Sequence, residues 1–211
     1  MDYVSAKNVK NLRVEDGDIS LDIVLGYPAK SQFDSVRKVV INALRGLPGV
    51  KNVSVNVSSQ IVAHAVQRGV KLLPGVKNII AIASAKGGVG KSSLTTNLAI
   101  AFSKLGFQVG ILDADVYGHS IPRLLGLIGQ RPTAIDEMFI PLESYGVKCV
   151  SMEMFKPDRA DAVAYRGPIL HKVLSQLLTD AYWGDLDFLF LDLPPGTGDL
   201  AISLGQLIPG S

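Results

Sequence analysis

AKGGVGKSS, residues 85–93, is the stretch of sequence that decides the fold. It lies between an apolar run, Ile79–Ser84, and a segment with helical spacing, Lys91–Leu105. A glycine-rich turn between a strand and a helix is the setting of a phosphate-binding loop, because successive backbone amides and the helix N-terminus point at the same anion. The sequence therefore predicts that the phosphates of a nucleotide are bound by Gly87, Gly88, Val89, Gly90, Lys91, Ser92 and Ser93.

Individual residues of this loop carry more specific expectations. Lys91 should reach the β and γ phosphates, and Ser92 offers a hydroxyl to Mg²⁺, a cation that takes few protein ligands. Lys86, five residues before Lys91, is the additional lysine that defines the deviant Walker A form of the motif. The general pattern has glycine where this chain has Ala85, a change that fits only if the backbone there has an ordinary φ.

Short, nearly all-apolar segments alternate with helical segments after residue 78, which is typical of buried parallel strands. The predicted fold class is α/β, a P-loop NTPase with a mostly parallel sheet and helices on both faces. The expected strands are Ile79–Ser84, Val109–Asp113, Val147–Ser151 and Phe188–Asp192, and the expected helices are Lys91–Leu105, Ile169–Ala181 and Asp199–Leu207.

Carboxylates stand at the ends of two of these strands. Asp113 and Asp115 lie in LDADVYGHS, residues 112–120, and Asp192 lies in LFLDLPPGTGD, residues 189–199, as in a Walker B motif. The carboxyl ends of parallel strands gather ligands at one sheet edge. We expect Asp115 to hold or polarise the attacking water, Asp192 to bind Mg²⁺ through water, and Asp113 to support the metal shell. A turn or helix-capping role for Asp113 or Asp115 stays open.

The first part of the chain predicts a separate small domain. Residues 1–58 read as a ββαβ α+β unit, residues 59–77 as a linker, and residues 78–211 as the P-loop ATPase domain. The expected elements of the small domain are a strand at 9–14, a turn at 15–18, a strand at 19–25, a helix capped by Ser31 and closed by Gly46, and a strand at 50–57.

Composition excludes several classes of protein. The 211 residues are 47% hydrophobic and 19% charged, which is typical of a folded domain and not of a disordered chain. No apolar run approaches the ~18 residues of a membrane-spanning helix, and the first residues lack a signal-peptide pattern, so we expect a cytoplasmic protein without a membrane partner. The single cysteine, Cys149, excludes an intrachain disulfide and a cysteine-only metal site.

The net charge of +2 is unevenly distributed. Residues 1–77 hold 11 Lys or Arg and 6 Asp or Glu, whereas residues 78–211 hold 10 and 13. A basic first part suggests a nucleic-acid or other anionic partner. Because no basic cluster or aromatic interleaving accompanies it, a solvated surface is favoured and no nucleic-acid partner is expected.

The motifs together resemble the deviant Walker A ATPases, the group that includes the MinD and ParA proteins and the nitrogenase iron protein. More narrowly, they resemble the Mrp/ApbC family of iron–sulfur cluster carrier ATPases, and the small domain is similar to the MIP18-like domain of many members. The segments that carry the resemblance are KGGVGKSS (86–93), DADVYGHSIPRLLG (113–126), RGP (166–168), WGDLD (183–187), DLPPGTGD (192–199) and, in the small domain, LPGVKNVSVNVS (47–58).

The resemblance implies a homodimer that binds ATP with Mg²⁺, hydrolyses it slowly and passes 4Fe–4S clusters to apo iron–sulfur proteins. The implied partners are these apoproteins and the cluster assembly machinery. It implies catalytic roles for Lys86, Lys91 and Asp115. In that group of ATPases the lysine that corresponds to Lys86 reaches across the dimer to the partner's nucleotide, so that hydrolysis depends on the dimer.

The chain also departs from the family. Members carry a CxxC pair well downstream of the Walker B region, whereas this sequence stops at Ser211 before any such pair. We therefore expect a truncated chain without iron–sulfur ligands, whose cluster belongs to the full-length protein. Two other hypotheses are a MinD- or ParA-like positioning ATPase acting on membrane or DNA, and a fragment that binds nucleotide without catalysis.

Overall fold

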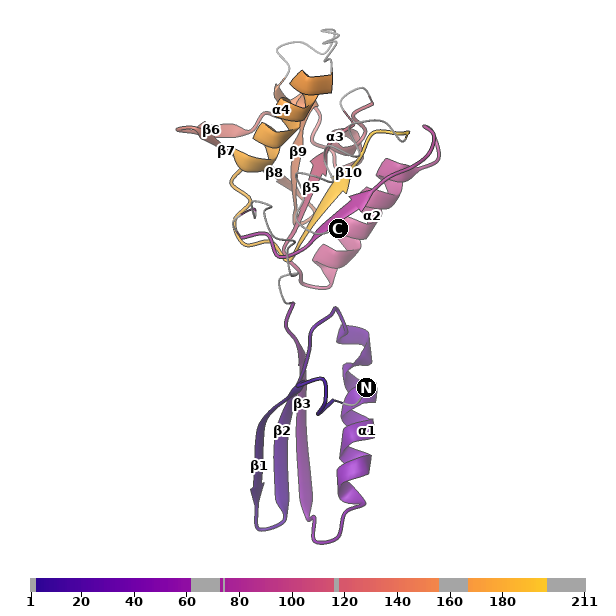
Figure 1. Cartoon of the computed structure of the whole chain (residues 1–211), viewed down its shortest axis with the longest axis vertical. Coiled ribbons are helices and arrows are strands. Elements are labelled where there is room, and N and C mark those ends of the chain that lie inside the picture. The colour runs from indigo at the N-terminus through magenta and orange to yellow at the C-terminus, as the bar shows by residue number, and fades with distance from the viewer. Residues whose placement is uncertain (1–2, 62–72, 74, 116–117, 156–166, 197–211) are drawn as a thin grey trace. The chain divides into compact units, whose positions relative to one another are not determined.

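A computed structural model, shown in Figure 1, describes residues 3–61, 73, 75–115, 118–155 and 167–196. The chain divides into two compact units, Met1–Val62 and Ala63–Ser211. Within the described residues, no helix is both long and apolar enough to cross a membrane.

The first unit is a three-stranded sheet covered by one helix. Strands β1 (Val9–Glu15) and β2 (Asp18–Leu25) form an antiparallel hairpin, and α1 (Phe33–Arg45) leads to β3 (Asn52–Ser59), which is parallel to β2. The turn residues Asp16 and Gly17 both have positive φ, of 49° and 92°, which is the geometry that suits a two-residue hairpin.

One face of this sheet packs on α1. Alternate residues of β2 and β3 are buried with Val36 of the helix, because successive strand side chains point to opposite faces. The prediction that Ser31 caps the helix is wrong. The chain enters α1 through a short 3-10 turn, η1 (Lys30–Gln32), so Gln32 holds the N-cap position and makes no side-chain cap hydrogen bond.

The second unit is built on a five-stranded sheet in the order β4-β10-β5-β9-β8. Its strands are β4 (Ile79–Ile82), β10 (Phe188–Asp192), β5 (Val109–Asp113), β9 (Val147–Ser151) and β8 (Leu142–Ser144). The first four are parallel, and β8 runs antiparallel to β9 at the edge. The predicted α/β class with a mostly parallel sheet is confirmed, although β8 was not predicted.

Helices α2 (Lys91–Lys104) and α4 (Gly167–Thr179) cover opposite faces of this sheet (Figure 1). On one face, leucines of β5 and β10 form a core with Leu174 and Leu177 of α4. On the other face, the Phe102 ring of α2 packs edge-to-face against Phe188 and Phe190 of β10, with ring centroids 4.9 and 5.5 Å away.

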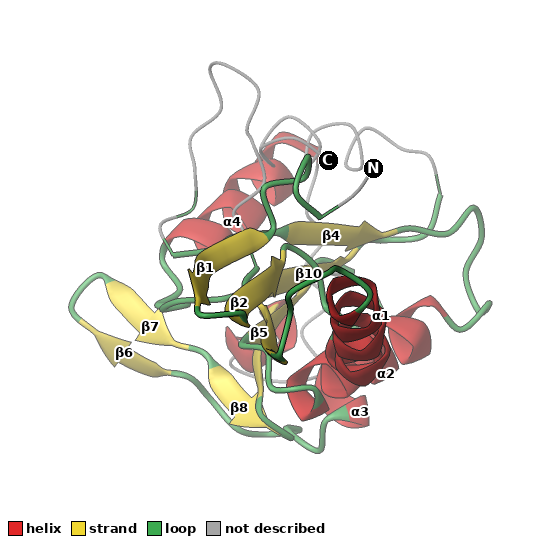
Figure 2. Cartoon of the chain, turned by 90° about the horizontal axis from the view of Figure 1, so that it is seen from below, coloured by secondary structure: helices red, strands yellow, loops and turns green. Residues whose placement is uncertain are grey.

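Several short elements complete the second unit. They are α3 (Ile121–Leu124), η2 (Met152–Phe155) and the hairpin of β6 (Thr133–Ile135) and β7 (Met138–Ile140), which extends from the body of the unit in Figure 2. None of these elements was predicted. The expected helix Asp199–Leu207 lies outside the described residues.

Candidate nucleotide-binding site

The glycine loop joins β4 to α2, as the sequence predicts. Gly88 and Gly90 have φ values of +75° and +90°, a region that residues with a Cβ rarely adopt, and Gly90 is the N-cap of α2. Ala85 does not have a positive φ, so its methyl group is compatible with the loop. The loop therefore has the backbone shape that turns several amides toward one anion.

A cavity of about 590 Å³ opens beside the loop. Most of the predicted phosphate-binding residues line it, namely Gly87, Gly88, Gly90, Lys91, Ser92 and Ser93. The segment after β5 and α3 contribute further lining residues, namely Asp115, Gly118, Ser120 and Arg123. Lys86 and Val89 are exposed and do not belong to the lining.

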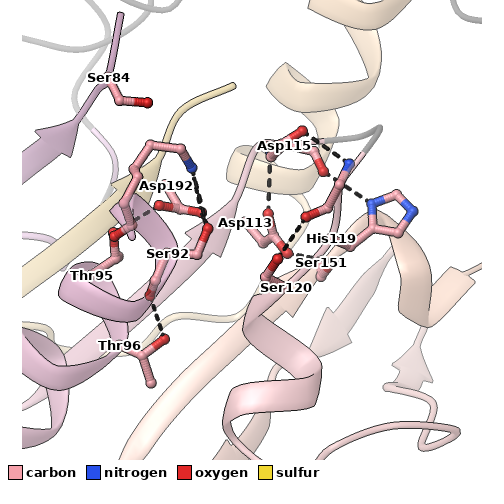
Figure 3. Close-up of polar contacts among 12 residues, drawn as sticks. Ser84, Ser92, Thr95, Thr96, Asp113, Asp115, His119, Ser120, Ser151 and Asp192 are labelled. Atoms are coloured by element: carbon pink, nitrogen blue, oxygen red, sulfur yellow. Dashed lines mark hydrogen bonds and ion pairs between the residues drawn. The ribbon is translucent and has the colours of Figure 1, made fainter. Parts of the chain in front are cut away.

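Asp192, fully buried at the end of β10, accepts contacts from three residues of α2 (Figure 3). The Lys91 ammonium lies 2.7 Å from its Oδ2, and the Ser92 hydroxyl donates to the same oxygen at 2.6 Å. The Thr95 hydroxyl donates to Oδ1 at 2.7 Å. The aspartate predicted from the strand end and the lysine and serine predicted from the loop are thus in direct contact.

Asp113 is buried below the cavity at the end of β5. Its Oδ1 accepts the Asp115 amide at 3.2 Å, and its Oδ2 accepts the Ser151 hydroxyl at 3.2 Å. Burial and then the nearby charge of Asp192 raise the pKa of Asp113 from 3.8 to about 8. At neutral pH this carboxyl is therefore mainly protonated.

Asp115 lines the cavity and also holds a turn together. Its Oδ1 accepts the Gly118 amide at 3.0 Å, and its backbone carbonyl lies 3.0 Å from Nδ1 of His119. Asp115 and Asp113 thus both make the turn contacts that the sequence left open. Asp115 is nearly buried, with 9% of its surface exposed, and among the described residues it is the carboxylate that lines the cavity.

The donor set fits Mg²⁺ but not an iron–sulfur cluster. The Ser92 hydroxyl and the Asp192 carboxylate are hard oxygen donors 2.6 Å apart, and Mg²⁺ is commonly held by one or two protein oxygens and phosphates. The described part of the chain contains no group of three or more His, Cys, Asp or Glu side chains that could hold a metal ion. Cys149 is buried in β9, and burial raises the pKa of its thiol well above the ordinary value.

Sequence reasoning missed three polar residues of the site. Thr95 lies one helical turn after Lys91 on α2 and donates to Asp192. Ser151 ends β9 beside β5, and Arg123 lies on the cavity wall. The position of Ser151 at a strand end could have indicated its role, whereas Thr95 and Arg123 carry no comparable signal. Arg166, the arginine of the RGP segment quoted for the family resemblance, lies outside the described residues.

Comparisons with known proteins give a consistent result. Residues 75–211 match the family model described as NUBPL iron-transfer P-loop NTPase, and residues 1–57 match that of an iron–sulfur cluster assembly protein. The chain is 42% identical over 221 residues to the iron–sulfur cluster carrier protein of Aquifex aeolicus, which covers 95% of this chain and 60% of that protein. It is 38% identical to the carrier protein of the same name from Haemophilus influenzae, over 99% of this chain and 56% of that protein.

A solved structure also resembles this chain. A nucleotide-binding protein from Archaeoglobus fulgidus in complex with ADP is 38% identical and covers 64% of this chain and 51% of its own, with a TM-score of 0.55. The chain therefore spans little more than half the length of the relatives that it matches.

Proposed function

Because the chain belongs to the family of NUBPL iron-transfer P-loop NTPases, we propose that it is part of an iron–sulfur cluster carrier that binds and hydrolyses ATP and transfers clusters to apoproteins. The resemblance to the Mrp/ApbC carriers is confirmed by the relatives, which are named iron–sulfur cluster carrier proteins. ATP hydrolysis, transfer to apoproteins, the homodimer and the cytoplasmic location belong to this proposal.

The contact of the loop with Asp192 is the observation that carries the proposal. Lys91 and Ser92 lie at the N-terminus of α2, where backbone amides favour an anion, and both contact a carboxylate from the neighbouring strand. In the proposed complex, the Lys91 ammonium turns from Asp192 to the β and γ phosphates. Ser92 and Asp192 would hold Mg²⁺, with Asp113 in support, and the ion would supply positive charge to offset that of the phosphates.

The other predicted residues have roles that follow from their positions. Asp115 lines the same cavity as the loop, where its carboxylate would orient the attacking water. Lys86 is exposed beside the loop, so its ammonium is available to a nucleotide on a second subunit. Transition-state charge would then be stabilised only in the dimer, which couples hydrolysis to assembly.

The 4Fe–4S cluster is proposed for the full-length protein. The described residues hold no cysteine cluster, and the chain spans about half the length of its relatives. The small first unit matches the iron–sulfur cluster assembly model, which supports a role in the same process. The partners proposed here are apo iron–sulfur proteins and the cluster assembly machinery.

The test uses the full-length protein, reconstituted with iron and sulfide without oxygen. We expect cluster absorption, transfer of the cluster to an apo-acceptor, and ATP hydrolysis that requires Mg²⁺. The Lys91→Ala variant should lose hydrolysis because the phosphates lose their lysine contact. Absence of both cluster absorption and transfer would contradict the carrier function. ATP-dependent retention on DNA or vesicles in its place would favour a MinD- or ParA-like positioning ATPase.

A further inference from the structure

Arg123 lines the nucleotide cavity from outside the phosphate loop. It belongs to the short helix α3, whose Ile121 and Pro122 are buried while Arg123 is exposed. Two backbone hydrogen bonds hold the helix, from the Leu124 amide to Ser120 at 3.1 Å and from the next residue to Ile121 at 3.0 Å. The buried half of α3 thus fixes the position from which the Arg123 guanidinium extends.

Among the described residues, two cationic side chains line this cavity, and they differ in their surroundings. The Lys91 ammonium is buried and paired with Asp192 at 2.7 Å. In the described part of the chain, Arg123 forms no ion pair with a carboxylate, and the Asp115 carboxylate of the same lining accepts the Gly118 amide. Arg123 therefore contributes to the cavity a positive charge that forms no ion pair with any acidic side chain of the described residues.

We propose that Arg123 binds the terminal phosphate of the nucleotide and makes the site prefer a nucleoside triphosphate to a diphosphate. This inference rests on the proposed function, because it assumes that the cavity binds a nucleotide. A guanidinium suits the task, since its planar donors can contact two phosphate oxygens at once. A triphosphate carries more negative charge than a diphosphate, and Arg123 supplies the same cavity with a cation that the loop does not provide.

The experiment measures two affinities by calorimetry, with Mg²⁺ and the full-length protein. One ligand is a non-hydrolysable ATP analogue and the other is ADP. We expect Arg123→Ala to weaken binding of the analogue about 10- to 100-fold, the loss of a hydrogen bond to a charged group, and to change ADP binding less than about 3-fold. Arg123→Lys should restore part of the affinity for the analogue. Arg13→Ala, an exposed arginine of the first unit, is the matched control and should change neither affinity.

The outcomes separate this inference from the proposed function. If the wild-type protein binds neither ligand, nucleotide binding itself is wrong. If it binds both, and Arg123→Ala weakens both equally or weakens neither, the role of Arg123 is wrong. Arg123→Gln keeps most of the side-chain length without the charge, so it provides the same comparison should the alanine variant fail to fold. The expected result for this variant is also a selective loss of analogue binding.

Discussion

Asp192 shows how much of the site depends on a single side chain. Its two carboxylate oxygens accept contacts from Lys91, Ser92 and Thr95, all within the first two turns of α2. A buried carboxylate is stable only when it is paired and hydrogen-bonded, and here its partners are also the side chains that would meet the ligand. The interaction that stabilises the folded site is therefore the one that ligand binding must rearrange.

Thr95→Val should destabilise the second unit. The valine has nearly the same shape, but Asp192 Oδ1 loses a donor in a buried setting, which costs about 1–3 kcal/mol. Urea unfolding followed by the fluorescence of Trp183, the single tryptophan of the chain and buried in the second unit, measures the free energy of unfolding. Thr95→Ser keeps the hydroxyl and is the control. Equal stability of the valine variant and the wild type would contradict this account.

Asp113→Asn should change how stability depends on pH. Below pH 3.8 the carboxyl is protonated in the folded and unfolded states, and between 3.8 and about 8 the unfolded state loses its proton first. The Asp113 contribution to stability is therefore full at low pH and is lost as pH rises to about 8, by on the order of 1 kcal/mol per pH unit. Asparagine removes this dependence.

Unfolding by urea at pH 5, 6, 7 and 8 tests this expectation for Asp113. The wild type should lose stability relative to Asp113→Asn as the pH increases across this range. Asp34→Asn, which changes a carboxylate whose side chain is 83% exposed, is the control and should run parallel to the wild type. Parallel curves for wild type and Asp113→Asn would show that the buried carboxyl titrates normally.

Among the elements, the buried strands are the ones that sequence predicts well. Val109–Asp113, Val147–Ser151 and Phe188–Asp192 are found with the predicted bounds, because each is a short, mostly apolar run, as is typical of buried parallel strands. Strands β6, β7 and β8 have only three residues each and mixed exposure, so they leave no periodic signal. The N-terminus of α1 was misjudged at Ser31 because a 3-10 turn, which a cap residue does not predict, precedes the helix.

Gly110 in β5 allows the strand to pack closely against the side chains of Leu186 and Trp183. A Cβ atom there would lie 2.8 Å from Leu186 Cδ1 and 3.0 Å from the Trp183 ring, and both neighbours are buried. Gly110→Ala should therefore cost about 1–3 kcal/mol through overpacking. Thermal unfolding monitored at Trp183 measures this loss. Gly87→Ala, in the same unit, where a Cβ atom meets nothing closer than 3.9 Å, is the control. A Gly110→Ala variant as stable as the wild type would mean that the neighbours adjust freely.

At the scale of the whole molecule, each of the two units has a core of its own. In the first, side chains of β2 and β3 pack with Val36, and in the second, leucines of β5 and β10 pack with α4. A change of hydrophobic pattern, from alternating strands before residue 58 to nearly all-apolar strands after residue 78, predicts two domains from sequence. The partners of each carboxylate could not be predicted in the same way, since they depend on strand order, which brings β10 between β4 and β5.

Ile23→Ala should unfold the first unit more easily without changing the second. Ile23 is 1% exposed in the core of the first unit, so truncation costs about 2–5 kcal/mol there. We expect the Trp183 fluorescence transition and nucleotide affinity to stay unchanged while the circular dichroism transition gains an earlier step. Leu174→Ala, in the other core, should do the reverse. A shift of the Trp183 transition in Ile23→Ala would show that the two units unfold together.

The buried pair of Lys91 and Asp192 affects which anions the site can bind. A small anion such as inorganic phosphate must compete with a carboxylate that already lies 2.7 Å from the ammonium. It would also leave that carboxylate without its cation, at a considerable desolvation cost. A polyphosphate that binds together with Mg²⁺ gives the Lys91 ammonium an anionic partner and the Asp192 carboxylate a cationic one at the same time. We therefore expect the resting protein to discriminate against the abundant simple anions of its surroundings before any contact with the rest of the nucleotide is made.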